Sequence, residues 1–288
     1  MSTPADAVEE FNLGAGVAGL RLTTRDGTVA EIARHGAHML RWQPAGHQPV
    51  LWVSNHSWFQ PGRPIRGGIP ICFPWFGAHP SDSSQPAHGT VRLQPWNLSG
   101  TESTSQGELV DVCLERAEGP FQLEYRVRIG RELKCSLRVH LPFEATQEAT
   151  CEAALHTYLA VSDIRTVEVR GLESLPYLNK VPGQADGGPA GQPITFSGET
   201  DRIYQHSDHS VSIVDSGWRR MITISKSGSL STVVWNPWID KSRRMPDFGD
   251  DEWTGMLCVE TAAVGSCRLS LRPGQSHTLQ AVIAVRHT

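Results

Sequence analysis

Two ionisable side chains, His156 and Glu260, stand in segments whose other residues are typical of buried strands. Alternation in CEAALHTYLAV (151–161) places His156 on a largely apolar face, and alternation in MLCVETAAV (256–264) places Glu260 among apolar neighbours. Burying an unpaired carboxylate costs several kcal/mol, so Glu260 needs a partner or a cavity. A histidine and a carboxylate can transfer protons, but a core histidine and a structural Glu–Arg pair are equally ordinary interpretations.

A second candidate is the segment RGGIPICFPWFGAHP (66–80), which begins with the single cation Arg66. It holds three prolines, three glycines and three large aromatic residues. Proline and glycine are poor in helices and central strands, so we predict a shaped loop. Its aromatic residues either cover the core or line a pocket whose occupant meets Arg66.

Other polar residues stand close to predicted turns or strands. AHGTVR contains His88 and Arg92 on either side of a glycine, and GETDRIY contains Asp201 in a strand-like run. None of these residues indicates a function when taken alone.

Period-two alternation dominates the chain and predicts the elements that must position these residues. It favours four hairpins, each with a turn near its middle, over 20–36, 125–139, 220–235 and 267–285. Convincing helices are scarce, and the Gly/Pro-rich segment 179–199 is typical of a long surface loop. We therefore expect one all-β, antiparallel domain over residues 1–288, with residues 1–18 loosely ordered.

Composition narrows the classes of function. The chain has 288 residues, of which 39% are hydrophobic, and a formal net charge of -4, which argues against nucleic-acid binding. We find no leader peptide and no apolar run long enough to cross a membrane. Six dispersed cysteines without a CxxC pair indicate a reduced, cytoplasmic protein. We expect a monomer that needs neither a metal nor another cofactor.

Five blocks occur in a fixed order over most of the chain: RGGIPICFPWFG, HGTVR, ALHTYLAVSDI, ETDRIY and VVWNPW…MPDFGDDEW…MLCVE. Together they resemble the hexose-6-phosphate mutarotases, also called glucose-6-phosphate 1-epimerases, of the galactose-mutarotase-like superfamily. The resemblance implies an antiparallel β-supersandwich with its sugar site in a cleft, and a sugar phosphate as the small-molecule partner.

The resemblance also implies roles for the central residues. His156 matches the family's general acid and Glu260 its general base. Asp201 matches an aspartate that holds sugar hydroxyls.

Further matches concern the ends of the sugar. Arg66 and Arg92 match arginines that face the phosphate, and His88 matches a histidine near the ring oxygen. Two positions depart from the family pattern. Ala87 replaces a common glutamine that touches the substrate, and Thr90 replaces a common aromatic wall.

The implied reaction interconverts the α and β anomers by opening a cyclic hemiacetal. A proton leaves the C1 hydroxyl while another reaches the ring oxygen. We hypothesise that Glu260 takes the first proton and that protonated His156 supplies the second from the opposite side of the C1–O5 bond. A nearby carboxylate is expected to keep His156 protonated near neutral pH.

Two alternatives share the same scaffold. An aldose 1-epimerase would act on unphosphorylated sugars, but two arginines in the site argue against it. A carbohydrate-binding protein without turnover would have no use for an acid–base couple.

Overall fold

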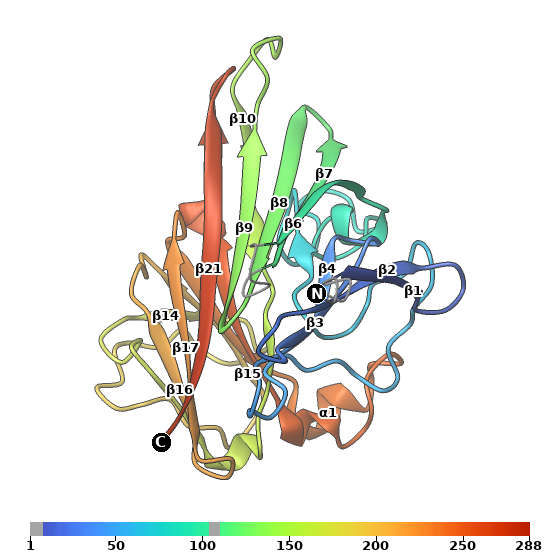
Figure 1. Ribbon diagram of the computed structural model, residues 1–288. Coiled ribbons are helices and arrows are strands. Elements are labelled where there is room, and N and C mark those ends of the chain that lie inside the picture. Colours follow the sequence, from blue (N-terminus) through green and yellow to red (C-terminus); the bar gives the residue numbers. More distant parts are fainter. Residues whose placement is uncertain (1–7, 104–109) are drawn as a thin grey trace, which may run out of the picture.

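Antiparallel sheets make up most of the regular secondary structure in the computed structural model, which describes residues 8–103 and 110–288 (Figure 1). The largest sheet has eight strands in the order β13-β16-β17-β21-β9-β8-β7-β6. A seven-stranded sheet has the order β14-β15-β18-β19-β11-β5, and β12 also pairs with β19. Two smaller sheets have the orders β1-β2-β3-β4 and β10-β20. The expected antiparallel all-β fold with few short helices is confirmed.

The strands of the eight-stranded sheet are β6 (Asn97–Ser103), β7 (Val110–Glu118), β8 (Phe121–Ile129), β9 (Glu132–His140), β13 (Val167–Arg170), β16 (Val211–Asp215), β17 (Arg220–Ser227) and β21 (Ser276–His287). The strands of the seven-stranded sheet are β5 (Ile71–Cys72), β11 (Ala153–Leu155), β12 (Tyr158–Ala160), β14 (Tyr177–Asn179), β15 (Thr200–Gln205), β18 (Ser231–Asn236) and β19 (Met256–Ala263). The smaller sheets contain β1 (Val8–Asn12), β2 (Ala18–Thr23), β3 (Val29–Ala33), β4 (His38–Gln43), β10 (Ala149–Cys151) and β20 (Leu269–Leu271). The helical elements are α1 (Trp238–Ser242) and the 3-10 turns η1 (Val91–Leu93), η2 (Ile164–Thr166), η3 (Glu252–Gly255) and η4 (Gly265–Cys267).

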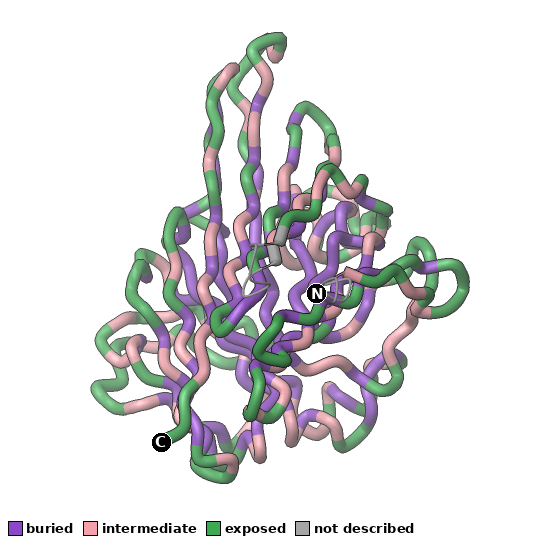
Figure 2. Tube along the Cα trace, in the orientation of Figure 1, coloured by how far each residue is buried: buried purple, intermediate pink, exposed green. Residues whose placement is uncertain are grey.

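Side-chain alternation explains how the two large sheets pack. Along β8, every second residue from Phe121 to Ile129 is buried, whereas the intervening ones are exposed or half-buried (Figure 2). The eight-stranded sheet therefore has one apolar face, as expected for a period-two pattern. Every residue of β18 and β19 is buried, and β19 also contacts β21 of the other sheet. Side chains on β19 are consequently held in the interior.

Two of the four predicted hairpins are confirmed and two are wrong. β2 pairs with β3, and β8 pairs with β9. By contrast, β17 and β18 belong to different sheets, and β20 pairs with β10 instead of β21. Alternation identifies a strand and its apolar face, but it does not identify the partner. At both places the chain crosses from one sheet to another.

The N-terminal prediction is also wrong where it can be checked. Residues 8–18 were expected to be loosely ordered, but β1 pairs with β2 over five residue pairs. Residues 1–7 lie outside the described residues. The predicted surface loop is confirmed between β14 and β15, where most residues are exposed or half-buried.

Candidate active site

His156 lies in the two-residue break between β11 and β12 and faces Glu260 on the neighbouring strand β19. β11 and β12 both pair with β19 in one register, in which Leu155 lies opposite Thr261 and Tyr158 opposite Cys258. The same register brings His156 opposite Glu260. His156 Nε2 lies 3.4 Å from Glu260 Oε1, and the two side chains are only 8% and 1% exposed. These residues are 104 positions apart in the sequence, and the sheet makes them direct neighbours.

Several buried polar atoms around this pair have no hydrogen-bond partner among the described residues. They are His156 Nδ1, Glu260 Oε2 and Arg92 Nε. An unsatisfied buried donor or acceptor costs about 1–3 kcal/mol. A ligand rich in hydroxyl and anionic groups would supply the missing partners.

Burial governs the protonation of the pair. Desolvation, and then the negative charge of Asp201, raises the pKa of Glu260 well above its ordinary range. Desolvation, then the electrostatic interaction with His88, and then the charges of Arg92 and Arg66 lower the pKa of His156 well below its ordinary value. Both shifts favour a neutral pair. This result differs from the expectation that Glu260 keeps His156 protonated, because the cost of burying charge outweighs the mutual attraction.

Arg66 is fixed by partners on two sides. Its Nε and Nη2 donate to the carboxylate oxygens of Asp247 at 3.2 Å each, and its Nη1 donates to Tyr158 Oη at 3.0 Å. The Asp247 side chain is 4% exposed and that of Arg66 is 20% exposed. Arg66 and Asp247 therefore form an ion pair, which offsets part of the charge of Arg66.

Arg92 differs from Arg66 in having no carboxylate counterion among the described residues. It lies on η1 and is buried, and its Nη2 donates to the carbonyl of Ala87 at 2.8 Å. None of the described carboxylates lies within ion-pair distance of its guanidinium. Burial, and then the charge of Arg66, lowers its pKa, but a guanidinium still stays charged at neutral pH. Ala87, one of the two departures from the family pattern, thus orients Arg92 through its backbone.

His88 lies against the acid–base pair in a fixed tautomer. The amide of Gly77 donates to its Nδ1 at 3.3 Å, so the ring proton is on Nε2. Its ring meets that of His156 edge-on, with centroids 5.4 Å apart. Burial, and then the charges of Arg92 and Arg66, lowers the pKa of His88 to about 3. The imidazole is therefore a neutral hydrogen-bond donor.

Asp201 lies on β15 and is the remaining predicted site residue. Burial raises its pKa, and Lys241 Nζ stands 3.8 Å from its carboxylate. The negative charge of Asp201 contributes to the raised pKa of Glu260. The four other predicted site residues are thus all linked to the His156–Glu260 pair by contact or by charge.

The aromatic loop contributes to both the core and the site. Phe73 is fully buried, whereas Phe76 is half-buried and lies edge-on to His88 at 4.8 Å between centroids. Gly89 has a φ of +77°, and a side chain there would overlap the carbonyl of Phe73. Only glycine allows the segment after His88 to approach the loop so closely. Thr90 is the second position that departs from the family pattern. Its hydroxyl donates a hydrogen bond to the carboxylate of Glu118 at 2.6 Å.

Sequence reasoning missed two residues of this site, Tyr158 and Asp247. Tyr158 stands two positions after His156, and that spacing along an extended segment places both on one face. Asp247 lies in the polar loop before η3, where no local pattern marks it as a partner of Arg66.

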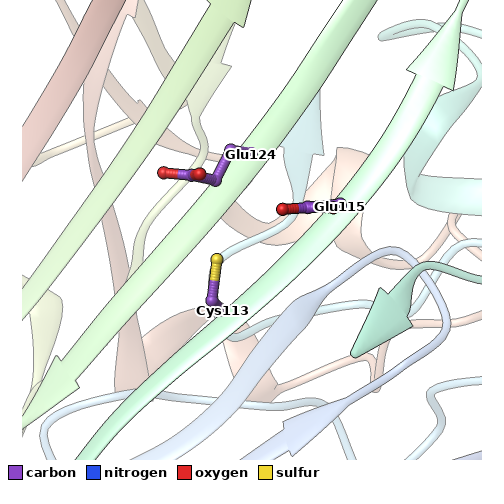
Figure 3. Close-up of side chains that lie close together, drawn as sticks. All are labelled: Cys113, Glu115 and Glu124. Carbon is purple, nitrogen blue, oxygen red and sulfur yellow. The ribbon is translucent and has the colours of Figure 1, made fainter. Parts of the chain in front are cut away.

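A group of possible metal ligands lies on the eight-stranded sheet, on strands that carry none of the predicted site residues. Cys113 and Glu115 of β7 and Glu124 of β8 bring ligand atoms within 4.8 Å of one another (Figure 3). Arg126 donates to Glu124 Oε1 at 3.4 Å and reaches Cys113 Sγ at 3.9 Å. The positively charged guanidinium of Arg126 therefore lies against two of the three possible ligands, so we assign no metal ion to the group.

In the described part of the chain, we find no helix of sufficient length and apolarity to span a membrane.

The fold and this site define a protein with galactose mutarotase-like architecture. A crystal structure of a "putative mutarotase" from Salmonella typhimurium superposes with a TM-score of 0.90 at 28% identity, covering 100% of this chain and 96% of that one. The sequence model of aldose 1-epimerases matches residues 19–284. The chain belongs to the aldose 1-epimerase family, and the expected class of enzyme, a sugar isomerase, is confirmed.

Curated relatives agree with this assignment. A protein of Escherichia coli K12 named "Putative glucose-6-phosphate 1-epimerase" is 34% identical over 260 residues, which cover 88% of this chain and 86% of the relative. A protein of Cenchrus ciliaris with the same name is 33% identical over 260 residues, which cover 85% and 78%.

Proposed function

We propose that this epimerase interconverts the α and β anomers of glucose 6-phosphate and of related aldohexose 6-phosphates. The observation that carries the proposal is the contact of His156 Nε2 with Glu260 Oε1 at 3.4 Å, together with the unpartnered second polar atom of each side chain. The names of the relatives in E. coli and Cenchrus ciliaris favour the phosphorylated substrate.

Ring opening requires two proton transfers at one carbon of the sugar. O1 and O5 are both bonded to C1, so an acid and a base that lie side by side can reach both oxygens. This arrangement replaces our initial picture of groups on opposite sides of the C1–O5 bond. Glu260 takes the O1 proton while His156 donates to O5, and each transfer contributes ~10²–10⁴-fold. The open aldehyde rotates about C1–C2 and recloses with the roles reversed.

The protonation of the free site fits this cycle. After ring opening, Glu260 carries a proton and His156 is neutral, and burial favours the same state before substrate binds. Ring opening of a cyclic substrate needs Glu260 deprotonated and His156 protonated. The proton must therefore move from Glu260 to His156 before the ring opens. The separation of 3.4 Å allows this transfer within the pair.

The remaining site residues suit the rest of the substrate. The phosphate would be held by Arg92, which has no counterion in the described part of the chain, and by the N–H groups that Arg66 does not donate to Asp247 or Tyr158. His88 Nε2–H and the Asp201 carboxylate would hold sugar oxygens. An aldose 1-epimerase acting on unphosphorylated sugars is the second candidate, because the matching family model carries that description.

Saturation-transfer exchange NMR on glucose 6-phosphate and on glucose tests the proposal. We expect the protein to accelerate anomer exchange of the phosphorylated sugar far more than that of glucose. Equal acceleration of both sugars would favour the second candidate. Binding without any acceleration would overturn catalysis and favour a carbohydrate-binding protein.

The rate of exchange is expected to fall on both the acid and the alkaline side of a plateau. The active pair carries one proton in total, so activity falls at low pH when it gains a second and at high pH when it loses its last. The lowered pKa of His156 moves the acid limb below the ordinary histidine value, and the raised pKa of Glu260 moves the alkaline limb above the ordinary glutamate value. Measuring kcat for glucose 6-phosphate against pH checks this. A single limb at the ordinary histidine value would contradict it.

Location and partners are part of the proposal. All six cysteines are free, and five are buried, which supports a reducing cytoplasmic setting. We expect a monomer that binds no nucleic acid, which size-exclusion chromatography and a DNA-binding titration would check.

A further inference from the structure

Tyr158 connects the two ends of the proposed site. Its hydroxyl accepts a hydrogen bond from Arg66 Nη1 at 3.0 Å. Its ring stacks on the His156 imidazole, with centroids 4.7 Å apart and planes inclined by 10°. Since His156 contacts Glu260 at 3.4 Å, one continuous series of contacts runs from Arg66 to the acid–base pair.

The surroundings leave the Tyr158 ring little freedom. The residue is 1% exposed, and its ring lies nearly parallel to Trp52 at 5.8 Å and edge-on to Trp235 at 5.9 Å between centroids. Its amide donates to the carbonyl of Gly68 at 2.9 Å, two residues beyond Arg66. A change at the Arg66 end is therefore transmitted to the ring, because packed interiors respond as a unit.

The phenol can also respond directly to a bound anion. Burial raises the pKa of Tyr158, so the hydroxyl keeps its proton at neutral pH. Because its oxygen already accepts from Arg66, the proton is free to be donated to an oxygen of an anion held beside Arg66. Tyr158 would then contact both the anion and the His156 ring.

The charges around His156 act in the same direction. The imidazole is faced by Glu260, His88 and the stacked phenol, and it also senses the positive charges of Arg66 and Arg92. After burial itself, these positive charges contribute to the low pKa of His156. A dianion bound by the two guanidinium groups would offset them and favour the imidazolium that ring opening requires.

We propose that Tyr158 couples the anion end of the site to the proton donor, so that a phosphate bound by Arg66 and Arg92 activates ring opening in addition to anchoring the sugar. The inference rests on the proposed function and deepens it. Binding energy from a remote group is then used in the transition state, not only for affinity. Tyr158 is a positioning residue, because it acts through His156 and not on C1.

Supplying the sugar and the anion separately tests the coupling. Glucose lacks the phosphate, and sulfate is a dianion too weakly basic to catalyse mutarotation strongly by itself. Exchange NMR on glucose is recorded with and without sulfate, with chloride at matched ionic strength and with enzyme-free blanks. Competition of sulfate against glucose 6-phosphate is measured in parallel. Coupling between sites typically amounts to 5–150-fold, so we expect saturating sulfate to raise enzymatic exchange of glucose at least about tenfold.

The variant Tyr158→Phe removes the hydroxyl and keeps the ring. We expect its stimulation by sulfate, expressed as the ratio of rates with and without the anion, to fall below about threefold. Tyr125→Phe is the matched control, because Tyr125 is a fully buried tyrosine of β8 in the other sheet. Its ratio should equal that of the wild type. In the wild-type protein, sulfate should also shift the ¹⁵N resonances of His156 toward those of an imidazolium.

Each other outcome would overturn the inference. Sulfate that competes with glucose 6-phosphate but leaves glucose exchange and the His156 resonances unchanged would show that the anion only anchors. Failure of sulfate to compete would remove the anion site itself, and full stimulation of Tyr158→Phe would remove the hydroxyl from the coupling. If the wild type exchanges glucose 6-phosphate while sulfate has no effect, only this inference fails. If it does not exchange glucose 6-phosphate, the proposed function fails.

Discussion

Glu260→Gln is expected to reduce anomer exchange of glucose 6-phosphate by about 10³-fold while leaving substrate binding nearly intact. Gln has the shape of glutamate but cannot take a proton from O1, and Glu260 is the carboxylate in contact with His156 at 3.4 Å. The loss should appear in kcat. Exchange NMR measures the rate, and isothermal titration calorimetry measures binding.

Glu31→Gln is the matched control for this substitution. Glu31 lies on β3 in a surface ion pair with Arg21 and does not contact the site. We expect wild-type exchange from it. Retention of a tenth or more of the wild-type rate in Glu260→Gln would exclude Glu260 as the base, and a matching loss of binding would point to a structural role instead.

Arg92→Ala is expected to lower the preference for the phosphorylated sugar by about 10²-fold, since a hydrogen bond to a charged group contributes about 1.5–3 kcal/mol and the proposed phosphate would accept more than one from Arg92. The quantity to measure is the ratio of kcat/KM for glucose 6-phosphate to that for glucose, which cancels general damage to the fold. Arg66→Ala should lower this ratio less, because Asp247 already offsets part of the charge of Arg66.

Arg128→Ala provides the control for loss of an arginine. Arg128 is half-exposed on β8 and pairs with Asp111, so its removal should leave the ratio unchanged. An unchanged ratio in Arg92→Ala would mean that the phosphate binds elsewhere, and the second candidate function would then gain support.

Much of the fold follows from local pattern. Alternation along β8 and β9 predicts both strands and their shared turn, because a connection of two residues holds the two strands side by side. The same reasoning fails after β17 and before β21, where the chain crosses between sheets. Partner choice there depends on how whole sheets pack, and this information is absent from a short segment.

The sequence alone determined the residue types of the site, the order of the blocks that carry them and the buried character of the strands around His156 and Glu260. Only the tertiary structure decided that the register of β19 makes these two residues neighbours, that Asp247 pairs with Arg66, and that no carboxylate of the described residues pairs with Arg92. The reason is physical. Alternation and residue type are local properties of the chain, whereas desolvation, ion pairing and pKa depend on which distant segments enclose a side chain.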